Sequence, residues 1–295
     1  MRFKEKRNGL DSRTRTKKVN RSKGGNIALF VFIGVLGIFM SLPMVYAVGN
    51  AFKPLDELWL FPPPLFPKNP TLTNFSDLFR LLQNSWVPLS RYLFNTIFIT
   101  VVGTTGSVIF ASMCAFALAK IDFPGAGFIF KLIVTSLMFS TAVTSIPNYI
   151  TMVRLNWIDT YKALIIPVMG SSLGLYLMKQ FMSQIPDALI EASQIDGAGY
   201  IRIFWKIIMP NVKSAWLTLI VFSVQALWNM GASVYVYSEQ LKTFPYAISQ
   251  IISGGIARAG VGSAVTVIMM IVPIGTFLIT QSNIIETMST SGMKD

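Results

Sequence analysis

The sequence predicts an all-α polytopic membrane protein with six transmembrane helices and with both its N- and C-termini in the cytoplasm. The composition indicates a membrane protein, because 53% of the 295 residues are hydrophobic and only 13% are charged, against about 25% charged in soluble domains. Six apolar stretches are long enough to cross a bilayer, which takes about 20 residues. The positions of lysine and arginine then set the orientation.

The N-terminal segment, residues 1–26, is strongly basic and holds ten Lys or Arg residues against two acidic ones. It has too few large apolar side chains to fold alone. A nucleic-acid arm is one interpretation, but a span follows directly, so a cytoplasmic tail beside anionic membrane lipid is favoured and no nucleic acid is expected as a partner. The first span, residues 27–48, exceeds the apolar core of a signal peptide, which has about 7–15 residues.

Residues 50–90 form the first connection and contain seven prolines. Proline fixes its own backbone and favours extended chain, so this connection is predicted to be an external loop rather than a separate domain. Within it the stretch TLTNFSDLFRLL, residues 71–82, is predicted to form a short surface helix that lies against the membrane.

The remaining apolar runs predict the other five spans, at about residues 92–119, 132–152, 163–182, 214–236 and 261–285. The fourth span contains Pro167, Gly170 and Gly174, which suits packing inside protein better than contact with lipid. Cys114 lies in the second apolar run and is expected to be a small packing residue. A single thiol excludes an internal disulfide, and without histidine no Cys/His metal cluster is possible.

Lysine and arginine are unevenly distributed between the two sides of the predicted membrane. With a cytoplasmic N-terminus, 17 of the 25 Lys and Arg residues fall in the inner segments 1–26, 120–131, 179–213 and 286–295. The positive-inside rule therefore places both termini in the cytoplasm, with residues 286–295 as a short C-terminal tail.

A short polar segment, residues 186–210, interrupts the apolar runs and carries three acidic and two basic residues. Pro186 and Asp187 suit the start of a helix, and Gly197 suits the left-handed turn that ends it. Beyond the turn, apolar residues recur at spacings of three and four and predict a second amphipathic helix. These residues are Ile201, Phe204, Ile207 and Ile208. From patterning alone, an ordinary amphipathic connector on the membrane surface explains the segment equally well.

The same segment contains Glu191-Ala192, Asp196-Gly197-Ala198, Phe204, Ile207 and Pro210. These residues and their spacing resemble the "EAA" signature of bacterial ABC-importer permease subunits. In that family the segment is the coupling helix, which docks into a groove on a cytosolic ATPase. Ser193 departs from the signature, where a second alanine is usual. The resemblance implies that the ATPase-coupling residues are Glu191, Ala192, Asp196, Gly197, Ala198, Phe204 and Pro210.

Two further segments are similar to the carbohydrate branch of the same family. The stretch AFALAKIDFPG, residues 115–125, resembles the turn after the second helix of carbohydrate-importer permeases. The stretch NWIDTYKALIIP, residues 156–167, resembles their entry into the fourth helix, with Asp159 where asparagine is common. The likeness covers roughly residues 27–295 and implies a maltose-type "G" permease with the type I ABC importer permease fold.

The resemblance also implies partners in a bacterial cell membrane. They are a second, homologous permease that completes a heterodimer, two copies of a cytosolic ABC ATPase and an extracytoplasmic sugar-binding protein. No cofactor is expected on this chain, since ATP and magnesium belong to the ATPase and the sequence has no G-x-x-x-x-G-K-[ST] motif. The predicted spans contain no acidic residue and the chain has no histidine, so neither an intramembrane enzyme nor an ion-driven carrier is expected.

Aromatic faces, amides and hydroxyls commonly hold sugars, and such groups fall on two predicted spans. Asn148 and Tyr149 lie on the third, and Gln225, Trp228 and Asn229 on the fifth. Interface anchoring and helix packing are the competing explanations for these residue types.

Two short stretches are similar to partner-contacting parts of the family. The glycine-rich loop over residues 253–262 matches in length and position a loop that enters the binding protein in maltose-type permeases, which points to Gly254, Gly255 and Ile256. An ordinary flexible loop is the alternative. The last residues, 291–295, resemble a short tail that reaches the ATPase, and a frayed terminus is the alternative there.

The substrate is predicted only as a class. A permease for a non-sugar solute would share the "EAA" signature but not the Phe-Pro-Gly and Thr-Tyr segments. Residues 285–294 are similar to the tails of oligosaccharide permeases from Gram-positive bacteria, including some for pectic or uronic plant-wall oligosaccharides. Malto-oligosaccharides and other sugars stay open.

Overall fold

The computed structural model describes residues 23–83, 87–231, 233–253 and 258–291, and within these ranges every regular element is a helix. The chain divides into two units, Met1–Tyr46 and Ala47–Asp295. Most of α1 (Lys23–Ala51) forms the first unit, and its only charged residue is Lys23. Within the described residues four helices are long and apolar enough to cross a membrane, or five if one bent pair counts as a single span.

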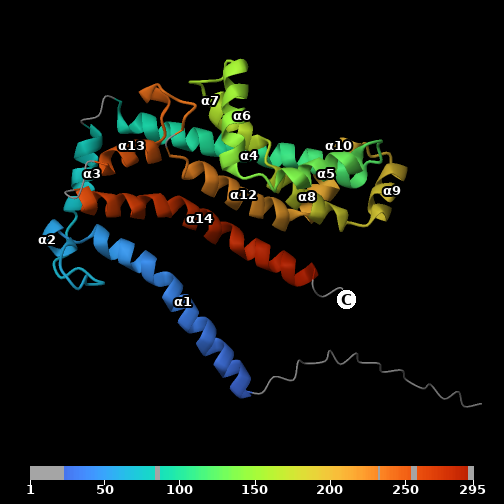
Figure 1. Cartoon of the computed structure of the whole chain (residues 1–295). Coiled ribbons are helices and arrows are strands. Elements are labelled where there is room, and N and C mark those ends of the chain that lie inside the picture. The colour runs from blue at the N-terminus through green and yellow to red at the C-terminus, as the bar shows by residue number, and fades with distance from the viewer. Residues whose placement is uncertain (1–22, 84–86, 232, 254–257, 292–295) are drawn as a thin grey trace, which may run out of the picture. The chain divides into compact units, whose positions relative to one another are not determined.

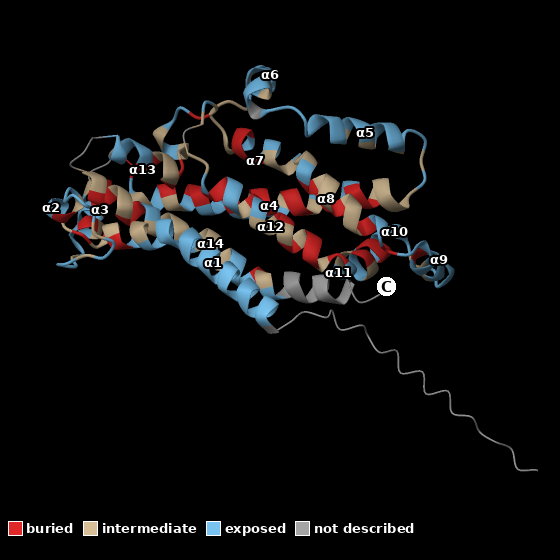
Figure 2. Ribbon diagram, turned by 60° about the horizontal axis from the view of Figure 1, so that its bottom comes forward, coloured by how far each residue is buried: buried red, intermediate tan, exposed pale blue. Residues whose placement is uncertain are grey.

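The second unit is organised around α4 (Leu89–Lys120), the central helix in Figure 1. One side of α4 packs against α7 (Tyr161–Met169) and α8 (Ser172–Ser183), and another packs against α12 (Lys213–Trp228). The last helix, α14 (Ala259–Ser291), packs on α12. In Figure 2 the buried residues gather along α4 and α12.

Small residues let these helices approach closely. A Cβ atom on Gly103 of α4 would lie 2.6 Å from Cδ1 of Leu227 of α12, and one on Gly174 of α8 would lie 2.8 Å from Cδ1 of Leu219. Glycine at helix–helix contacts is typical of membrane proteins, because packing rather than a solvent-driven effect holds their helices together.

At one end of the unit, α2 (Leu55–Leu58), α3 (Thr73–Gln83) and α13 (Phe244–Ile252) gather around the beginnings of α4 and α14. The proline-rich chain there is held by buried polar groups. The Asn74 amide donates to the carbonyls of Ala51 and Lys53, at 2.9 and 2.7 Å. The carboxylate of Glu57 accepts from the backbone N–H groups of Lys68 and Asn69, at 2.9 and 2.8 Å.

The predicted surface helix over residues 71–82 corresponds to α3, but its surroundings differ from the prediction. Leu78 and Leu82 are buried in a cluster with Tyr92, Phe244 and Val261. The apolar face of α3 therefore packs on protein, because α13 and α14 supply apolar surface that the local sequence pattern does not reveal.

A second group of buried polar side chains lies near the start of α4. The fully buried Asn95 amide donates to the carbonyls of Gln240 and Lys242, both at 2.8 Å, and its Oδ1 atom accepts from the Tyr161 hydroxyl at 2.7 Å. The Thr96 hydroxyl accepts from the backbone N–H of Phe244 at 2.8 Å. These bonds tie α7 and the connection before α13 to α4.

The predicted third span, residues 132–152, is not one continuous helix. It consists of α5 (Ala126–Ser136) and α6 (Thr141–Arg154), and residues 137–140 lie outside both. The Ser136 hydroxyl donates to the carbonyl of Ile133 and is bonded to the Ser172 hydroxyl of α8 at 2.7 Å. Serine side chains that bond to backbone offer an alternative to helix continuation, and the contact with α8 holds this break in place.

The predicted fifth span, residues 214–236, is also too long, because α12 ends at Trp228. The Asn229 amide bonds to the carbonyl of Gln225, at 2.9 Å, and Gly231 follows shortly afterwards. Glycine disfavours helix, and residues 233–238 instead pack and bond with α6 and the connection before α7. The fourth span likewise breaks at Gly170, between α7 and α8.

The structure also differs from the prediction in the exposure of Cys114 and in the end of the last helix. Cys114 is exposed rather than packed, and it borders a cavity of about 330 Å³ beside the break at Gly170. The helix α14 continues to Ser291 instead of ending at residue 285, since residues 286–291 contain neither glycine nor proline and Gly292 follows. The N-terminal tail up to residue 22 and residues 292–295 lie outside the described residues.

We expect the substitution Gly103→Leu to destabilise the isolated chain by about 1–3 kcal/mol, because the new side chain overpacks the contact with Leu227. The unfolding temperature measures this change; it is obtained by heating the detergent-solubilised protein and quantifying the remaining folded fraction by size-exclusion chromatography. Gly275→Leu is the matched control, since a Cβ atom at Gly275 meets nothing within 4 Å. Equal unfolding temperatures for the two variants would contradict the close α4–α12 contact.

Candidate functional site

The predicted coupling segment, residues 186–210, lies at the end of the second unit opposite α2 and α3 (Figures 1 and 2). It begins with α9 (Asp187–Ile195) and continues, after a turn, through α10 (Tyr200–Ile203), the π-helix η1 (Phe204–Ile208) and α11 (Met209–Asn211). The chain then bends by 81° into α12. The helix, glycine turn and second helix match the sequence pattern.

The turn between the two helices depends on Gly197. Its φ of +79° is in the left-handed region, which glycine adopts without strain. Its N–H bonds to the carbonyl of Gln194, and the N–H of Ala198 bonds to that of Ser193, both at 2.9 Å. A Cβ atom at Gly197 would meet nothing within 4 Å, so the backbone conformation, and not lack of space, calls for glycine.

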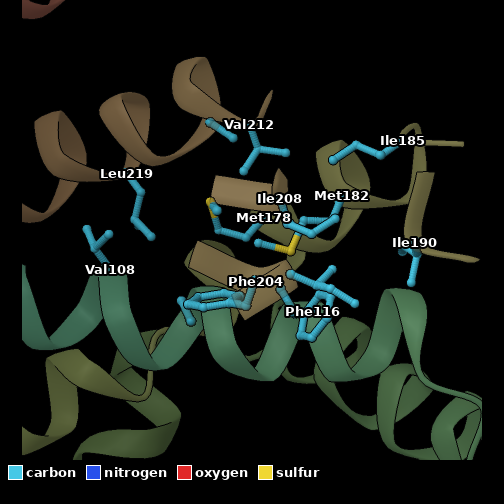
Figure 3. Close-up of a cluster of buried hydrophobic side chains, with 14 residues drawn as sticks. Val108, Phe116, Met178, Met182, Ile185, Ile190, Phe204, Ile208, Val212 and Leu219 are labelled. Atoms are coloured by element: carbon cyan, nitrogen blue, oxygen red, sulfur yellow. The ribbon is translucent and has the colours of Figure 1, made fainter. Parts of the chain in front are cut away.

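A buried apolar cluster anchors the second half of the segment to three long helices (Figure 3). Phe204 is 4% exposed, and its ring centre lies 5.6 Å from that of Phe116 of α4. The anchoring cluster consists of Val108, Ala111, Ala115, Phe116, Met178, Met182, Ile185, Ile190, Ile203, Phe204, Ile208, Val212, Ala215 and Leu219. It joins the segment to α4, α8 and α12.

The π-helix changes which residues face this cluster. Ile201, which the helical pattern places on the apolar stripe, is 78% exposed, whereas Ile203 is fully buried. A π-helix has a wider turn than an α-helix, so an α-helical spacing rule misassigns the buried face. π-Helical turns are frequent at functional sites.

The predicted coupling residues fall into two groups. Glu191 and Ala192 on α9, Asp196 and Gly197 in the turn, and Pro210 in α11 are exposed, whereas Phe204 is buried and Ala198 packs at the edge of the anchoring cluster. The first group presents two carboxylates and a small-residue surface that a partner can reach. Phe204 and Ala198 hold this surface on the helices.

A charged contact that the sequence does not reveal joins α9 to α4. The Lys120 ammonium donates to the carbonyl of Ile185, at 2.5 Å, and to the carboxylate of Asp187, at 2.6 Å. The side chain of Lys120 is 3% exposed and that of Asp187 is 75% exposed. The position of Lys120 at the end of an apolar run is the only sequence signal, and it does not identify the partner.

The sugar-contact candidates on the third span lie near the connection that follows α12. Asn148 is exposed on α6, and the Tyr149 hydroxyl is bonded to the Tyr237 hydroxyl at 2.8 Å. The Tyr149 ring also stacks on that of Tyr235, with ring centres 6.3 Å apart. The structure therefore gathers three tyrosines at this point, only one of which the sequence indicated.

The sugar-contact candidates on the predicted fifth span differ in exposure. Trp228 is 6% exposed and its indole N–H donates to the carbonyl of Met269, at 3.1 Å, so its ring packs α12 on α14. Gln225 and Asn229 are exposed. The loop candidates Gly254, Gly255 and Ile256 lie outside the described residues.

Asp159 organises the connection between α6 and α7. Its φ of +59° is in the left-handed region, which aspartate and asparagine tolerate better than most residues. Its carboxylate accepts from the Ser238 hydroxyl and from the N–H groups of Ser238 and Tyr237, at 2.9 and 3.0 Å. The Ser238 hydroxyl and then its N–H, the larger causes, hold the pKa of Asp159 below its ordinary value despite partial burial.

We expect Phe204→Ala to lower the stability of the isolated chain by about 3 kcal/mol, because it leaves a cavity beside Phe116. Ile201→Ala, three residues away and exposed, is the control and should have little effect. Thermal unfolding of both purified variants measures the difference. If Ile201→Ala were the more harmful, the exposed position of that residue would be refuted.

Because the pKa of Asp159 is depressed, the stability of the connection that it holds together should depend on pH. The Asp159 carboxylate stabilises its contacts with Tyr237 and Ser238 fully at pH values above the ordinary aspartate pKa, about 3.9. This stabilisation is lost as the pH falls through the lower pKa of the folded state. Hydrogen-exchange protection factors of Tyr237 and Ser238 should therefore stay constant near neutral pH and decrease below about pH 4. Asp159→Asn should weaken this pH dependence, and an unchanged profile in that variant would rule out Asp159 as its source.

Comparison with known proteins places the chain in a family. The family model described as binding-protein-dependent transport system inner membrane component matches residues 27–287. Protein LplC of Bacillus subtilis is 32% identical over 75% of this chain and 72% of its own length. The sn-glycerol-3-phosphate transport system permease protein UgpE of Yersinia enterocolitica is 30% identical over 81% and 80%. The polygalacturonan/rhamnogalacturonan transport system permease protein YtcP of Bacillus subtilis is 26% identical over 76% of each chain.

A solved structure has the same fold. It is a chain from a bacterial ABC transporter involved in the import of the acidic polysaccharide alginate, with a TM-score of 0.74 and 23% identity, covering 89% of this chain and 98% of that one. At this identity the likeness concerns the fold. The family match over most of the chain and the relatives at 30% identity or more go further: this chain is a multi-pass membrane protein that belongs to the family of binding-protein-dependent transport system inner membrane components.

Proposed function

We propose that this chain is one of two permease subunits of an ATP-driven, binding-protein-dependent importer of sugars or oligosaccharides, and that residues 186–210 couple it to a cytosolic ATPase. The observation that carries the proposal is the architecture of this segment. Exposed Glu191 and Asp196 are presented on a short helix and turn, and the anchoring cluster fixes the following helix to α4, α8 and α12. Family membership supports the same role.

Such a segment can convert movement of a partner into movement of the spans. When ATP binding closes the ATPase pair, a docked α9 would be displaced. The anchoring cluster is close-packed, and close-packed interiors transmit strain rather than absorb it. Displacement of α9 would then move α4, α8 and α12 together, as expected for rigid-body rocking of helices around a pore.

In this proposal the chain itself is not catalytic. ATP and magnesium bind to the two ATPase copies, a second, homologous permease supplies the other half of the pore, and an extracytoplasmic binding protein delivers the solute. Tyr149, Asn148, Gln225 and Asn229 are the side chains that we propose for the solute pathway. Trp228 is a weaker candidate, since its indole N–H already bonds to α14.

The proposed substrate class is an oligosaccharide. The relative whose name gives polygalacturonan and rhamnogalacturonan supports plant-wall oligosaccharides, which the C-terminal sequence also suggests. The relative named for sn-glycerol-3-phosphate supports a second candidate, a non-sugar solute that carries phosphate. Calorimetric titration of the cognate binding protein with pectic oligosaccharides, malto-oligosaccharides and glycerol phosphate distinguishes these candidates.

We expect Glu191→Lys to abolish solute uptake, because it reverses the charge on the exposed face of α9 that meets the ATPase. Uptake of labelled solute by cells or reconstituted vesicles measures the effect. The variant should still insert in the membrane, since Glu191 is exposed and makes no contribution to the anchoring cluster.

Gln184→Lys serves as the control for this variant. Gln184 is exposed and caps the C-terminal end of α8, two residues before the coupling segment, so the added lysine tests charge without altering α9. Uptake should be retained in Gln184→Lys. Normal uptake in Glu191→Lys would refute the docking role of α9.

A further inference from the structure

The helix α9 has few attachments to the rest of the molecule. Ile190 is its only buried residue, and Leu189 and Ile195 are 46% and 87% exposed. The anchoring cluster takes most of its members from α4, α8, α12 and the chain after the Gly197 turn. Ile185 just before α9 and Ala198 just after it also contact the cluster, but these apolar contacts are non-directional, and within α9 only Ile190 adds to them. Apolar packing alone therefore leaves the direction of α9 weakly fixed.

The Lys120 contact supplies the missing constraint. Its ammonium reaches the Ile185 carbonyl, just before α9, and the Asp187 carboxylate, in the first turn of α9. Lys120 is the last residue of α4, where a cation is favoured by the helix dipole, and Asp187 is favoured in the same way at the start of α9. Two charge-assisted bonds therefore connect the end of α4 to the beginning of α9.

The environment of Lys120 makes this contact hard to replace. Its side chain is 3% exposed, so the ammonium has lost most of its contact with solvent. A buried ammonium without partners is strongly unfavourable, whereas an exposed ion pair contributes little. Holding the Ile185 carbonyl and the Asp187 carboxylate in place is thus a condition for burying the charge, and this condition fixes the orientation of α9.

We propose that Lys120 is a positioning residue for energy coupling. It fixes the direction of α9 relative to α4, so that a displacement of α9 by the ATPase moves α4. This inference rests on the proposed coupling function. Without the contact, α9 would still dock but would pivot about Ile190, and ATP hydrolysis would proceed with less solute transported.

The geometry can be measured directly in the assembled importer. Spin labels at Gln194 of α9 and at Ile97 of α4, both exposed, report the angle between the helices, because Ile97 lies about 35 Å along α4 from Lys120. The labels require Cys114→Ser, which removes the only cysteine. We expect one narrow distance distribution for the parent and for Lys120→Arg, and a shifted or broadened one for Lys120→Met.

The functional measurement is the amount of solute transported per ATP hydrolysed in vesicles that hold the complete importer. We expect Lys120→Met to lower this ratio about tenfold and Lys120→Arg to retain it. Asp187→Asn keeps the bond to Ile185 and should lower the ratio about threefold. Lys179→Met is the matched control, since Lys179 lies over the Phe130 ring at 4.3 Å, away from residues 185–187, and its ratio should be unchanged.

A merely structural role for Lys120 predicts a different result. The amount of assembled importer would fall, while the distance distribution and the ratio per assembled complex would stay those of the parent, and this outcome would overturn the inference. If Lys120→Met does not assemble, Asp187→Asn decides alone, because Asp187 is exposed. Parent-like distances and a parent-like ratio in that variant would equally overturn it.

Failure of this inference is distinguishable from failure of the proposed function. Normal uptake in Glu191→Lys would remove the coupling role of α9, whatever Lys120 does. Impaired uptake in Glu191→Lys, together with parent-like distances and ratios in the Lys120 and Asp187 variants, would preserve the coupling role and reject Lys120 as its positioning residue.

Discussion

The anchoring cluster beneath residues 186–210 is the contact on which the rest of this structure depends. The helices of the segment are short, and isolated helices of fewer than about 12–15 residues are marginal in water. They keep their shape because Ile203, Phe204 and Ile208 are buried among side chains of α4, α8 and α12. The polar segment that we propose to meet a soluble ATPase is thereby packed directly on the long apolar helices.

The long helix α4 connects the two ends of the unit. It has 32 residues, about 48 Å at 1.5 Å per residue. At its beginning, Tyr92 belongs to the cluster with α3, α13 and α14, while Asn95 bonds to α7 and to the connection before α13. At its other end, Phe116 belongs to the anchoring cluster and Lys120 holds α9. One continuous helix therefore joins the packing clusters at the two ends of the unit.

Helix breaks concentrate on one side of α4. The α5–α6 pair breaks after Ser136 and the α7–α8 pair breaks at Gly170, and the hydroxyls of Ser136 and Ser172 join the two breaks at 2.7 Å. Backbone that leaves a helix at membrane depth needs polar partners that lipid cannot supply. The Ser136–Ser172 contact gives the two breaks a polar connection within the protein.

The sequence by itself determined those features that depend on local chemistry. The lengths of the apolar runs predicted α1 and α4, the polar composition and Gly197 predicted the helix–turn–helix form of residues 186–210, and the signature residues predicted the family. These succeed because hydrophobic length, left-handed backbone and spacing along one helix are set by neighbouring residues. Only the tertiary structure decided that Phe204 and Ile203 face inward while Ile201 is exposed, that α12 ends at Trp228, and that Lys120 meets Asp187. Those outcomes depend on which distant surface packs against each residue, and a pattern along the chain carries no record of that surface.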